Sequence, residues 1–254
     1  MKSPFNGALF RKLLPSWDLC YYEETSSTNL KAMEAVKAGE VQSGTVFVAD
    51  KQTLGVGRRG TPWQSQAREN LLFSAVIETE LPPVAIGKVA IAAGLVLAEK
   101  LAKYSDSITV KWPNDIYIEN KKVAGILVQH VDGFSVIGVG LNVFTTDFPV
   151  ELNATSLLLE ATTELSREDI LISILQGLLE KVSLCEYYFP QILKQLEPFD
   201  RLSDHWITYK EEGAMHQAKV LGIAEDASLI VLKNGKTRYL TSVSEIQIIK
   251  EPIL

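Results

Sequence analysis

Residues 108–143 read ITVKWPNDIYIENKKVAGILVQHVDGFSVIGVGLNV, and this stretch decides the fold class. Its β-branched and apolar runs predict strands at 108–111, 116–118, 122–130 and 135–143. Asp132-Gly133, between the last two runs, is a strong signal for a two-residue hairpin turn. This part of the chain is therefore predicted to be a set of consecutive strands.

The segments on either side add helices and further strands. Short apolar or β-branched runs predict strands at 19–24, 45–49 and 71–77. The helical spacing of apolar residues predicts helical regions at 29–38, 82–103 and 167–196. Pro190 must break or kink the last of these regions, because proline removes a backbone donor and clashes with the preceding turn. Residues 1–205 are thus predicted to form one mixed α/β domain.

The pattern changes beyond residue 205. Four short runs separated by turn residues, among them Asn234-Gly235, predict strands at 218–223, 229–232, 237–240 and 245–249. Residues 206–254 are therefore predicted to form a small β-barrel. A unit of this size buries little core by itself, so it is expected to pack on the first domain.

Composition excludes several classes of protein. The 254 residues are 46% hydrophobic, which excludes disorder along the whole chain. A net charge of −6 argues against a protein that coats nucleic acid. Cys20 and Cys185 form no metal or redox pattern, so the reducing cytoplasm is the expected location. The longest apolar stretch, 84–101, contains three charged residues, and no membrane span is predicted.

The first motif that carries chemistry is Gly55-Val56-Gly57-Arg58-Arg59-Gly60. Its letters match G-x-G-x-x-G, but it does not connect a strand to a helix, so it is not a Rossmann fingerprint. Three glycines allow a close backbone approach, and two guanidinium groups can pair with phosphate or carboxylate oxygens. The alternative is a solvated, flexible basic loop within residues 52–66.

The second motif is Lys111-Trp112-Pro113-Asn114-Asp115. Pro113 removes a backbone donor, and Asn114 and Asp115 favour a local turn. Such a turn is the alternative to a functional role.

The strand that follows begins with two lysines. Strand alternation predicts that Lys122, Ala124 and Ile126 share one face, and that Lys121 and Gly125 lie on the other. Periodicity does not decide which face lines a site.

The third motif is Ser26-Ser27-Thr28-Asn29, ahead of a predicted helix. Serine and threonine are favoured N-caps, so capping is the alternative to ligand binding here. The three histidines, His130, His205 and His216, have no metal-ligand spacing.

Together and in this order, the motifs resemble those of the biotin protein ligase family. The marks of the resemblance are Ser27-Thr28-Asn29, Gln52 with the loop to Trp63, Lys111 to Asp115 with Lys122, and Gly138-Val139-Gly140-Leu141-Asn142. They cover about residues 24–143. The resemblance implies an α+β fold: a mixed, largely antiparallel sheet with flanking helices, similar to class II synthetases, and a small C-terminal SH3-like β-barrel.

The resemblance also implies an activity. Family members use ATP, with Mg²⁺, to convert biotin into biotinoyl-5′-adenylate, and then transfer biotin to one lysine of the biotin carboxyl carrier protein of acetyl-CoA carboxylase. Little chain precedes Ser27, so the helix-turn-helix of some members is not expected here, and no specific DNA binding is predicted. Any homodimer is expected to form through strands of the catalytic domain.

The family pattern assigns roles to individual positions. Lys122 and Arg58 are the implied catalytic residues, and Asp115 is connected with magnesium. The implied biotin-binding residues are Ser27, Thr28, Asn29, Gln52, Val56, Gly57, Arg58, Lys122 and Gly125. The implied ATP- and adenylate-binding residues are Arg58, Arg59, Trp63, Asn114, Asp115 and Asn142.

The sequence departs from the family pattern in the glycine-arginine loop, where Val56 and Thr61 replace two arginines. Both changes remove charge from the segment that covers the ligand, and so bear on retention of the intermediate. Two other functions stay open at this stage. One is a related ligase acting on lipoate or a medium-chain fatty acid, and the other is a non-enzymatic biotin sensor.

Overall fold

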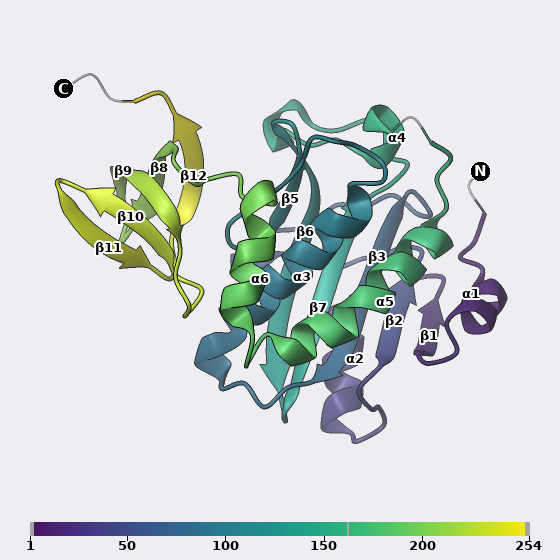
Figure 1. Cartoon of the computed structure of the whole chain (residues 1–254). Coiled ribbons are helices and arrows are strands. Elements are labelled where there is room, and N and C mark those ends of the chain that lie inside the picture. Colours follow the sequence, from purple (N-terminus) through teal and green to yellow (C-terminus); the bar gives the residue numbers. More distant parts are fainter. Residues whose placement is uncertain (1–2, 162, 252–254) are drawn as a thin grey trace.

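The computed structural model describes residues 3–161 and 163–251, which form two sheets and their helices (Figure 1). The larger sheet has seven strands in the order β1-β2-β3-β7-β6-β5-β4. In that order they are Asp18–Tyr22, Thr45–Ala49, Asn70–Glu78, Phe134–Asn142, Lys121–Val131, Asp115–Ile118 and Ile108–Lys111. β1 and β2 are parallel, and every other neighbouring pair is antiparallel. The prediction of a mixed, largely antiparallel sheet with flanking helices is confirmed.

Helices cover both faces of this sheet. One face packs against α3 (Ile86–Leu101) and α5 (Arg167–Leu184), with α6 (Phe189–Leu196) beside them (Figure 1). The other face packs against α2 (Thr28–Lys37) through a separate apolar cluster. Alternation along β2 produces this division, because Val46 and Val48 belong to the first cluster and Phe47 to the second.

Two helical predictions need adjustment. The helix expected from residue 82 is preceded by a 3₁₀ turn, Pro83–Ala85, so the α-helix itself begins at Ile86. The expected break near Pro190 is complete, since α5 ends at Leu184 and Pro190 lies in the first turn of α6, where its missing N–H costs nothing. The short helices α1 (Gly7–Leu13) and α4 (Leu157–Glu160) were not predicted.

The second sheet is antiparallel throughout, in the order β11-β10-β9-β8-β12. Its strands in chain order are Trp206–Glu211, Ala214–Ile223, Leu229–Lys233, Lys236–Leu240 and Ser244–Ile249. Strand β8 was missed, because only Ile207 and Tyr209 on it are fully buried, and Thr208 between them and the two residues after them are polar. The closure of this sheet into an SH3-like barrel stays a prediction.

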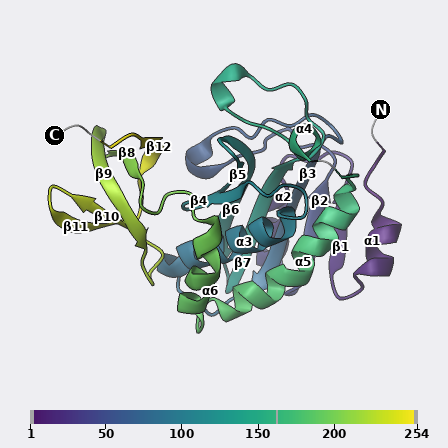
Figure 2. The same cartoon turned by 45° about the horizontal axis from the view of Figure 1, so that its top comes forward.

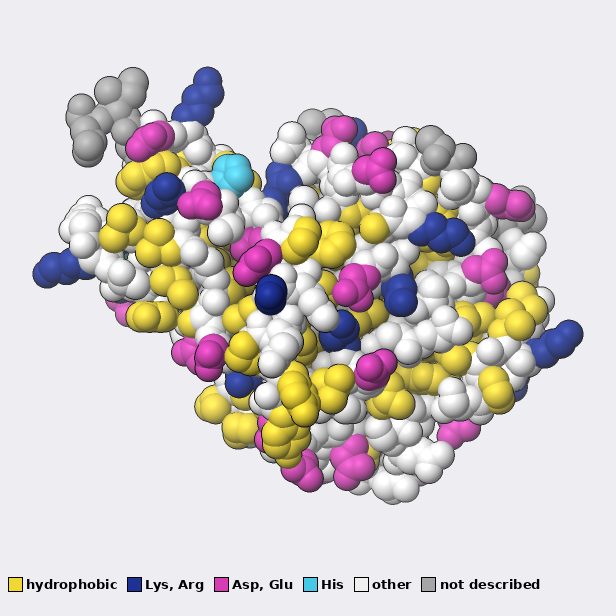
Figure 3. Space-filling view, in the orientation of Figure 1, with side chains coloured by type: hydrophobic (Ala, Val, Ile, Leu, Met, Phe, Trp, Pro, Cys, Tyr) yellow, Lys and Arg dark blue, Asp and Glu magenta, His cyan; other side chains and the backbone are white. Residues whose placement is uncertain are grey.

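The distribution of charged side chains on the surface is consistent with the small negative net charge of the protein. On the face seen in Figure 3, acidic and basic side chains are interspersed, and no large area carries a single sign of charge. Figure 2 shows the C-terminal sheet standing beside the larger domain rather than covering its helices. Within the described residues, no helix is both long enough and apolar enough to cross a membrane.

Candidate active site

A cavity of about 710 Å³, within the range typical of ligand sites, is lined by the larger sheet with its loops and by residues 243–247 at the start of β12. All the positions that the sequence singled out line this one cavity: Ser27, Thr28, Asn29, Gln52, Val56, Gly57, Arg58, Arg59, Trp63, Asn114, Asp115, Lys122, Gly125 and Asn142. They come from segments up to 115 residues apart in the chain. The fold therefore brings the separate motifs into a single site.

Ser27 precedes α2 but does not cap it. Its side chain makes no capping hydrogen bond; instead the side-chain oxygen Oε1 of Gln52 accepts from the Thr28 backbone N–H at 2.7 Å and from the Thr28 hydroxyl at 3.0 Å. Gln52 thus satisfies the first N–H of the helix, which has no partner inside the helix. The capping interpretation of Ser27 is wrong, and its buried hydroxyl faces the cavity.

Asn29 is fixed by two residues that the sequence analysis missed. The Ser74 hydroxyl lies 2.5 Å from Asn29 Oδ1 and 2.8 Å from Thr28 Oγ1, and Asn29 Nδ2 donates to Gln129 Oε1 at 3.0 Å. A fully buried serine in the otherwise apolar strand β3 was the available signal, because buried polar groups need partners. These contacts hold a rigid polar wall at one end of the cavity.

Lys122 faces the cavity for a reason that alternation did not predict. In the β5–β6 pair, Ile116 lies opposite Ala124 and Tyr117 opposite Lys122, so Val123 is an extra, bulged residue. Ala124 and Ile126 point into the core, while a Cβ atom at Gly125 would lie 3.1 Å from Lys122 Nζ.

The prediction that Lys122 shares one face of the strand with Ala124 and Ile126 is therefore wrong. Lys122 shares its face with Gly125. Lys121 still points away from the cavity and lies 3.6 Å from Glu160.

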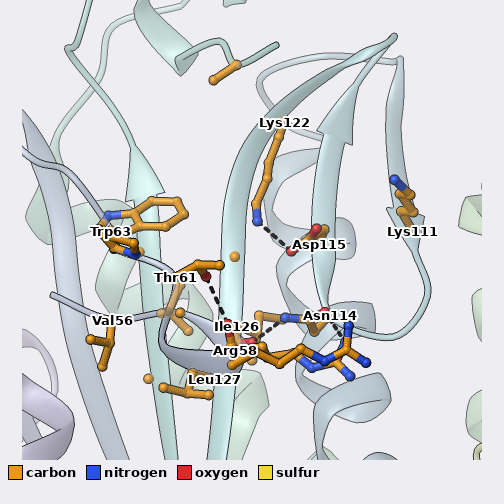
Figure 4. A pocket seen from close by; sticks show the side chains of 18 of the residues that line it. Val56, Arg58, Thr61, Trp63, Lys111, Asn114, Asp115, Lys122, Ile126 and Leu127 are labelled. Atoms are coloured by element: carbon orange, nitrogen blue, oxygen red, sulfur yellow. Dashed lines mark hydrogen bonds and ion pairs between the residues drawn. The ribbon is translucent and has the colours of Figure 1, made fainter. Parts of the chain in front are cut away.

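The charged groups of the site are held by the turn at residues 111–115. Lys122 Nζ lies 2.7 Å from an Asp115 carboxylate oxygen, and an Arg58 guanidinium nitrogen donates to Asn114 Oδ1 at 3.2 Å (Figure 4). Burial lowers the pKa of Arg58, and the neighbouring Arg59 lowers it further. Two cations of the cavity are thus each tied to one residue of the same turn.

Trp63 lies over the floor of the cavity. A Cβ atom at Gly140 would be 2.4 Å from the indole ring, so only glycine leaves room for the indole there, and one at Gly125 would be in tight contact with it at 3.2 Å. Gly125 and Gly140 are paired on β6 and β7, and Lys122 Nζ lies 5.6 Å from the Trp63 ring centroid. The indole N–H is buried and has no hydrogen-bond partner within the described residues.

Lys111 and Tyr117 also line the cavity and were not among the predicted site residues. The Lys111 ammonium group lies 5.4 Å from the centre of the Tyr117 ring. Burial lowers the pKa of Lys111, and burial with the Asp115 charge raises the pKa of Tyr117 to about 12. Lys111 was part of a quoted motif, but nothing in the sequence showed that its side chain turns toward the site.

The Asn153–Thr155 segment holds Lys122 in place. The Lys122 N–H donates to the Asn153 carbonyl at 3.0 Å, and the Thr155 N–H donates to the Lys122 carbonyl at 2.9 Å. Asn142 Nδ2 in turn donates to the Thr155 carbonyl at 3.0 Å. Asn142 therefore supports the segment that holds Lys122, and its side chain still lines the cavity.

Asp115 is the one carboxylate that was connected with magnesium. Mg²⁺ is usually bound through one or two carboxylates together with substrate phosphates, so the single carboxylate of Asp115 fits such a site. Among the described residues, no three His, Cys, Asp or Glu side chains gather into a metal-binding cluster. A divalent ion here would depend on the phosphates of a bound nucleotide.

Comparison with known proteins identifies relatives of the chain. The model of the Biotin/lipoate A/B protein ligase family matches residues 21–142. A biotin--[acetyl-CoA-carboxylase] ligase of Mycobacterium tuberculosis is 36% identical over 140 residues, which are 53% of this chain and 53% of that protein. The bifunctional ligase/repressor BirA of Escherichia coli is 38% identical over 46% of this chain and 37% of its own length. The matched part thus spans about half or less of these two relatives.

A solved structure shows the same architecture. The biotin protein ligase from Aquifex aeolicus in complex with biotin and ATP superposes with a TM-score of 0.76 at 26% identity, covering 92% of this chain and 99% of that one. The similarity extends over both sheets, not only over the matched family segment.

Proposed function

Because this chain belongs to the Biotin/lipoate A/B protein ligase family through residues 21–142, we propose that it is a biotin protein ligase. It activates biotin with ATP to biotinoyl-5′-adenylate and transfers biotin to a lysine of a biotin carboxyl carrier protein, that of acetyl-CoA carboxylase. One observation carries the proposal: every residue that the family pattern assigns to biotin, ATP or catalysis lines one cavity.

The polar end of the cavity suits the ureido ring of biotin. Ser27, Thr28, Asn29 and Gln52 offer both donors and acceptors there, and Ser74 and Gln129 keep Asn29 in a fixed orientation. Preorganised polar groups bind a matching ligand without the entropic cost of ordering them on binding. A plain acyl chain has no polar atom to match these donors and acceptors, which disfavours a fatty-acid ligase.

The cationic middle of the cavity suits adenylate formation. The biotin carboxylate must attack the α-phosphate of ATP, so two anionic groups have to approach each other. Lys122 and Arg58 reduce that repulsion and stabilise the charge that develops in the transition state. The reaction then needs no covalent enzyme intermediate, because pyrophosphate leaves directly.

The remaining roles follow from position. Trp63, Arg59, Asn114 and Asn142 would contact the adenylate, and Val56 and Gly57 would cover biotin from the loop. Bound Mg²⁺ would supply positive charge to the phosphates, with Asp115 as its protein ligand. Closure of the loop over the ligand protects the mixed anhydride from hydrolysis. The cytoplasm is the proposed location, and any homodimer would use strands of the larger domain.

The direct test is to incubate the protein with ATP, biotin and a carrier domain. We expect pyrophosphate release that depends on biotin, and an increase in carrier mass by one biotin group. Biotin binding without pyrophosphate release would support a non-enzymatic biotin sensor instead.

Ligand-dependent stability separates biotin from lipoate. Biotin at 100 times its Kd should add about 2.7 kcal/mol to the free energy of unfolding and raise the melting temperature. Lipoate at the same concentration should leave the melting temperature unchanged, because it has no ureido group for the polar end of the cavity. Thermal unfolding followed by fluorescence measures both. Stabilisation by lipoate alone would identify a lipoate ligase.

Val56→Arg should slow the release of biotinoyl-adenylate about tenfold, or about 1.4 kcal/mol. Val56 is partly exposed at the mouth of the cavity, and an arginine there can donate to the adenylate phosphate. The measurement is the dissociation rate of preformed adenylate, chased with excess biotin and ATP. Thr61→Arg should have a smaller effect, since Pro62 restricts its backbone. Equal rates for wild type and Val56→Arg would show that the loop already closes through its present residues.

A further inference from the structure

The C-terminal sheet touches the active-site turn at one buried point. The Trp112 indole N–H donates to the Ala227 carbonyl at 2.8 Å, and both residues are buried. Trp112 lies in the 111–115 turn, and Ala227 lies in the connection between β9 and β10 of the other sheet. The hydrogen bond thus joins the two parts of the molecule, 115 residues apart in sequence.

The acceptor side of this contact is rigid. In the 224–228 turn, the Ser228 N–H and hydroxyl both donate to Asp226 Oδ1, at 3.0 and 2.6 Å, and the Ala224 N–H donates to the Ser228 carbonyl at 2.8 Å. The same Ser228 hydrogen bonds lower the pKa of Asp226. The Ala227 carbonyl is therefore presented in a fixed direction.

The turn that contains the donor, Trp112, also contacts a proposed catalytic group, the guanidinium group of Arg58. Two residues after Trp112, Asn114 donates through Nδ2 to the Ile126 carbonyl at 2.7 Å and accepts from Arg58 at 3.2 Å. A displacement of the turn would move Asn114, and with it the guanidinium group of Arg58. Arg58, Trp112 and Asn114 also line a second cavity of about 210 Å³, which residues 226–228 line as well.

We propose that Trp112 is a positioning residue for adenylation. Its N–H anchors the 111–115 turn on the C-terminal sheet, so that this sheet holds Asn114, and through it Arg58, at the reacting groups. This inference rests on the proposed function, and it assigns to the C-terminal sheet a role in the first chemical step.

The first test replaces Trp112 by phenylalanine, which keeps an aromatic ring but cannot donate the hydrogen bond. We expect kcat for biotin-dependent pyrophosphate release to fall about tenfold, while the Kd for biotin stays within twofold, because Asn29 is held by Ser74 and Gln129 on other strands. Trp17→Phe is the matched control: Trp17 is buried to the same extent, 4% exposed, and does not line the cavity. It should leave kcat unchanged.

A second pair of variants tests the same contact without touching the site. A Cβ atom at Gly87, in α3, would lie 3.1 Å from the Ala227 Cβ atom, so Gly87→Ala should push the 224–228 turn outward. We expect kcat to fall about threefold, since small misplacements already reduce rates. Adding Ala227→Gly removes the opposing methyl group and should restore kcat; glycine also accepts the φ of +70° at this position.

A double-mutant cycle locates the effect. If Trp112 acts through Asn114, the Trp112→Phe/Asn114→Ala variant should be no slower than Asn114→Ala alone. Hydrogen exchange in the free protein gives an independent readout: Trp112→Phe should lose protection at residues 114–116 and 224–228, and Trp17→Phe should not.

The inference is overturned if Trp112→Phe keeps kcat within twofold of wild type, or if its loss simply adds to that of Asn114→Ala. A wild-type protein that releases no pyrophosphate with biotin would contradict the proposed function instead. The exchange experiment would then still decide whether Trp112 anchors the turn.

Discussion

Lys122→Ala should fold normally and lose adenylation by about 10²–10³ in rate, the equivalent of about 2.7–4 kcal/mol. The Lys122 ammonium group is held between the Asp115 carboxylate and the Trp63 ring, where a bulge and the Asn153–Thr155 segment fix its backbone on both sides. A cation so placed costs no reorganisation when charge develops between the biotin carboxylate and the α-phosphate. Biotin-dependent pyrophosphate release measures the loss.

Lys121→Ala is the internal control for this prediction. It removes the same side chain from the neighbouring residue, but Lys121 is exposed and lies near Glu160, outside the cavity. Its rate should stay within twofold of wild type, and an exposed ion pair of this kind contributes little to stability. A Lys122→Ala enzyme that keeps half of the wild-type rate would show that Lys122 is an ordinary surface residue of β6.

Gly138→Ala should raise the Kd for biotin about 100-fold, or about 2.8 kcal/mol. The new Cβ atom would lie 2.1 Å from Asn29 Oδ1 and 2.7 Å from Asn29 Cγ, so Asn29 has to leave its present position. Its hydrogen bonds to Ser74 and Gln129 would be lost with the shift. Overpacking a filled site usually costs about 1–3 kcal/mol, and here the cost falls on the polar end of the cavity.

Isothermal titration with biotin measures this effect, and melting temperature reports on the fold. Gly177→Ala is the matched control, because a Cβ atom there, in α5, makes only ordinary contacts of 3.4 Å or more, with Lys100 and Val96. It should bind biotin like wild type, and alanine suits the helix interior better than glycine. Unchanged biotin affinity in Gly138→Ala would mean that Asn29 does not contact biotin.

Much of the fold could be predicted from local sequence. The Asp132-Gly133 turn closes the β6–β7 hairpin, and both residues have positive φ, +47° and +83°, as a two-residue hairpin turn requires. Pro190 lies in the first turn of α6 and not in a continuous helix, because proline does not fit a helix interior. Such features depend on the backbone conformations that a residue type allows, and these can be read directly from the sequence. The missed strand β8 shows the converse, since it forms between β9 and β12, which follow it in the chain.

The candidate site could be predicted only as a list of residues. Its members were found because their types and order follow a family pattern, yet the pattern says nothing of which partner each one contacts. The cap on α2 comes from Gln52, 24 residues away, rather than from Ser27. The roles of Ser74 and Gln129 could be recognised only in the folded structure, because these residues contact Asn29 rather than a ligand.

By itself, then, the sequence determined most of the elements and their turns, because these follow from propensities and local spacing. The list of predicted site residues came from the family resemblance. The direction of Lys122 was decided by the tertiary structure. Alternation holds only along an uninterrupted strand, and one extra residue at Val123 reverses it, so that Lys122 and Gly125 share a face. Whether a bulge forms depends on the backbone on either side of Lys122. On one side is β5, which a turn separates from β6, and on the other is the Asn153–Thr155 segment, which is distant in the sequence.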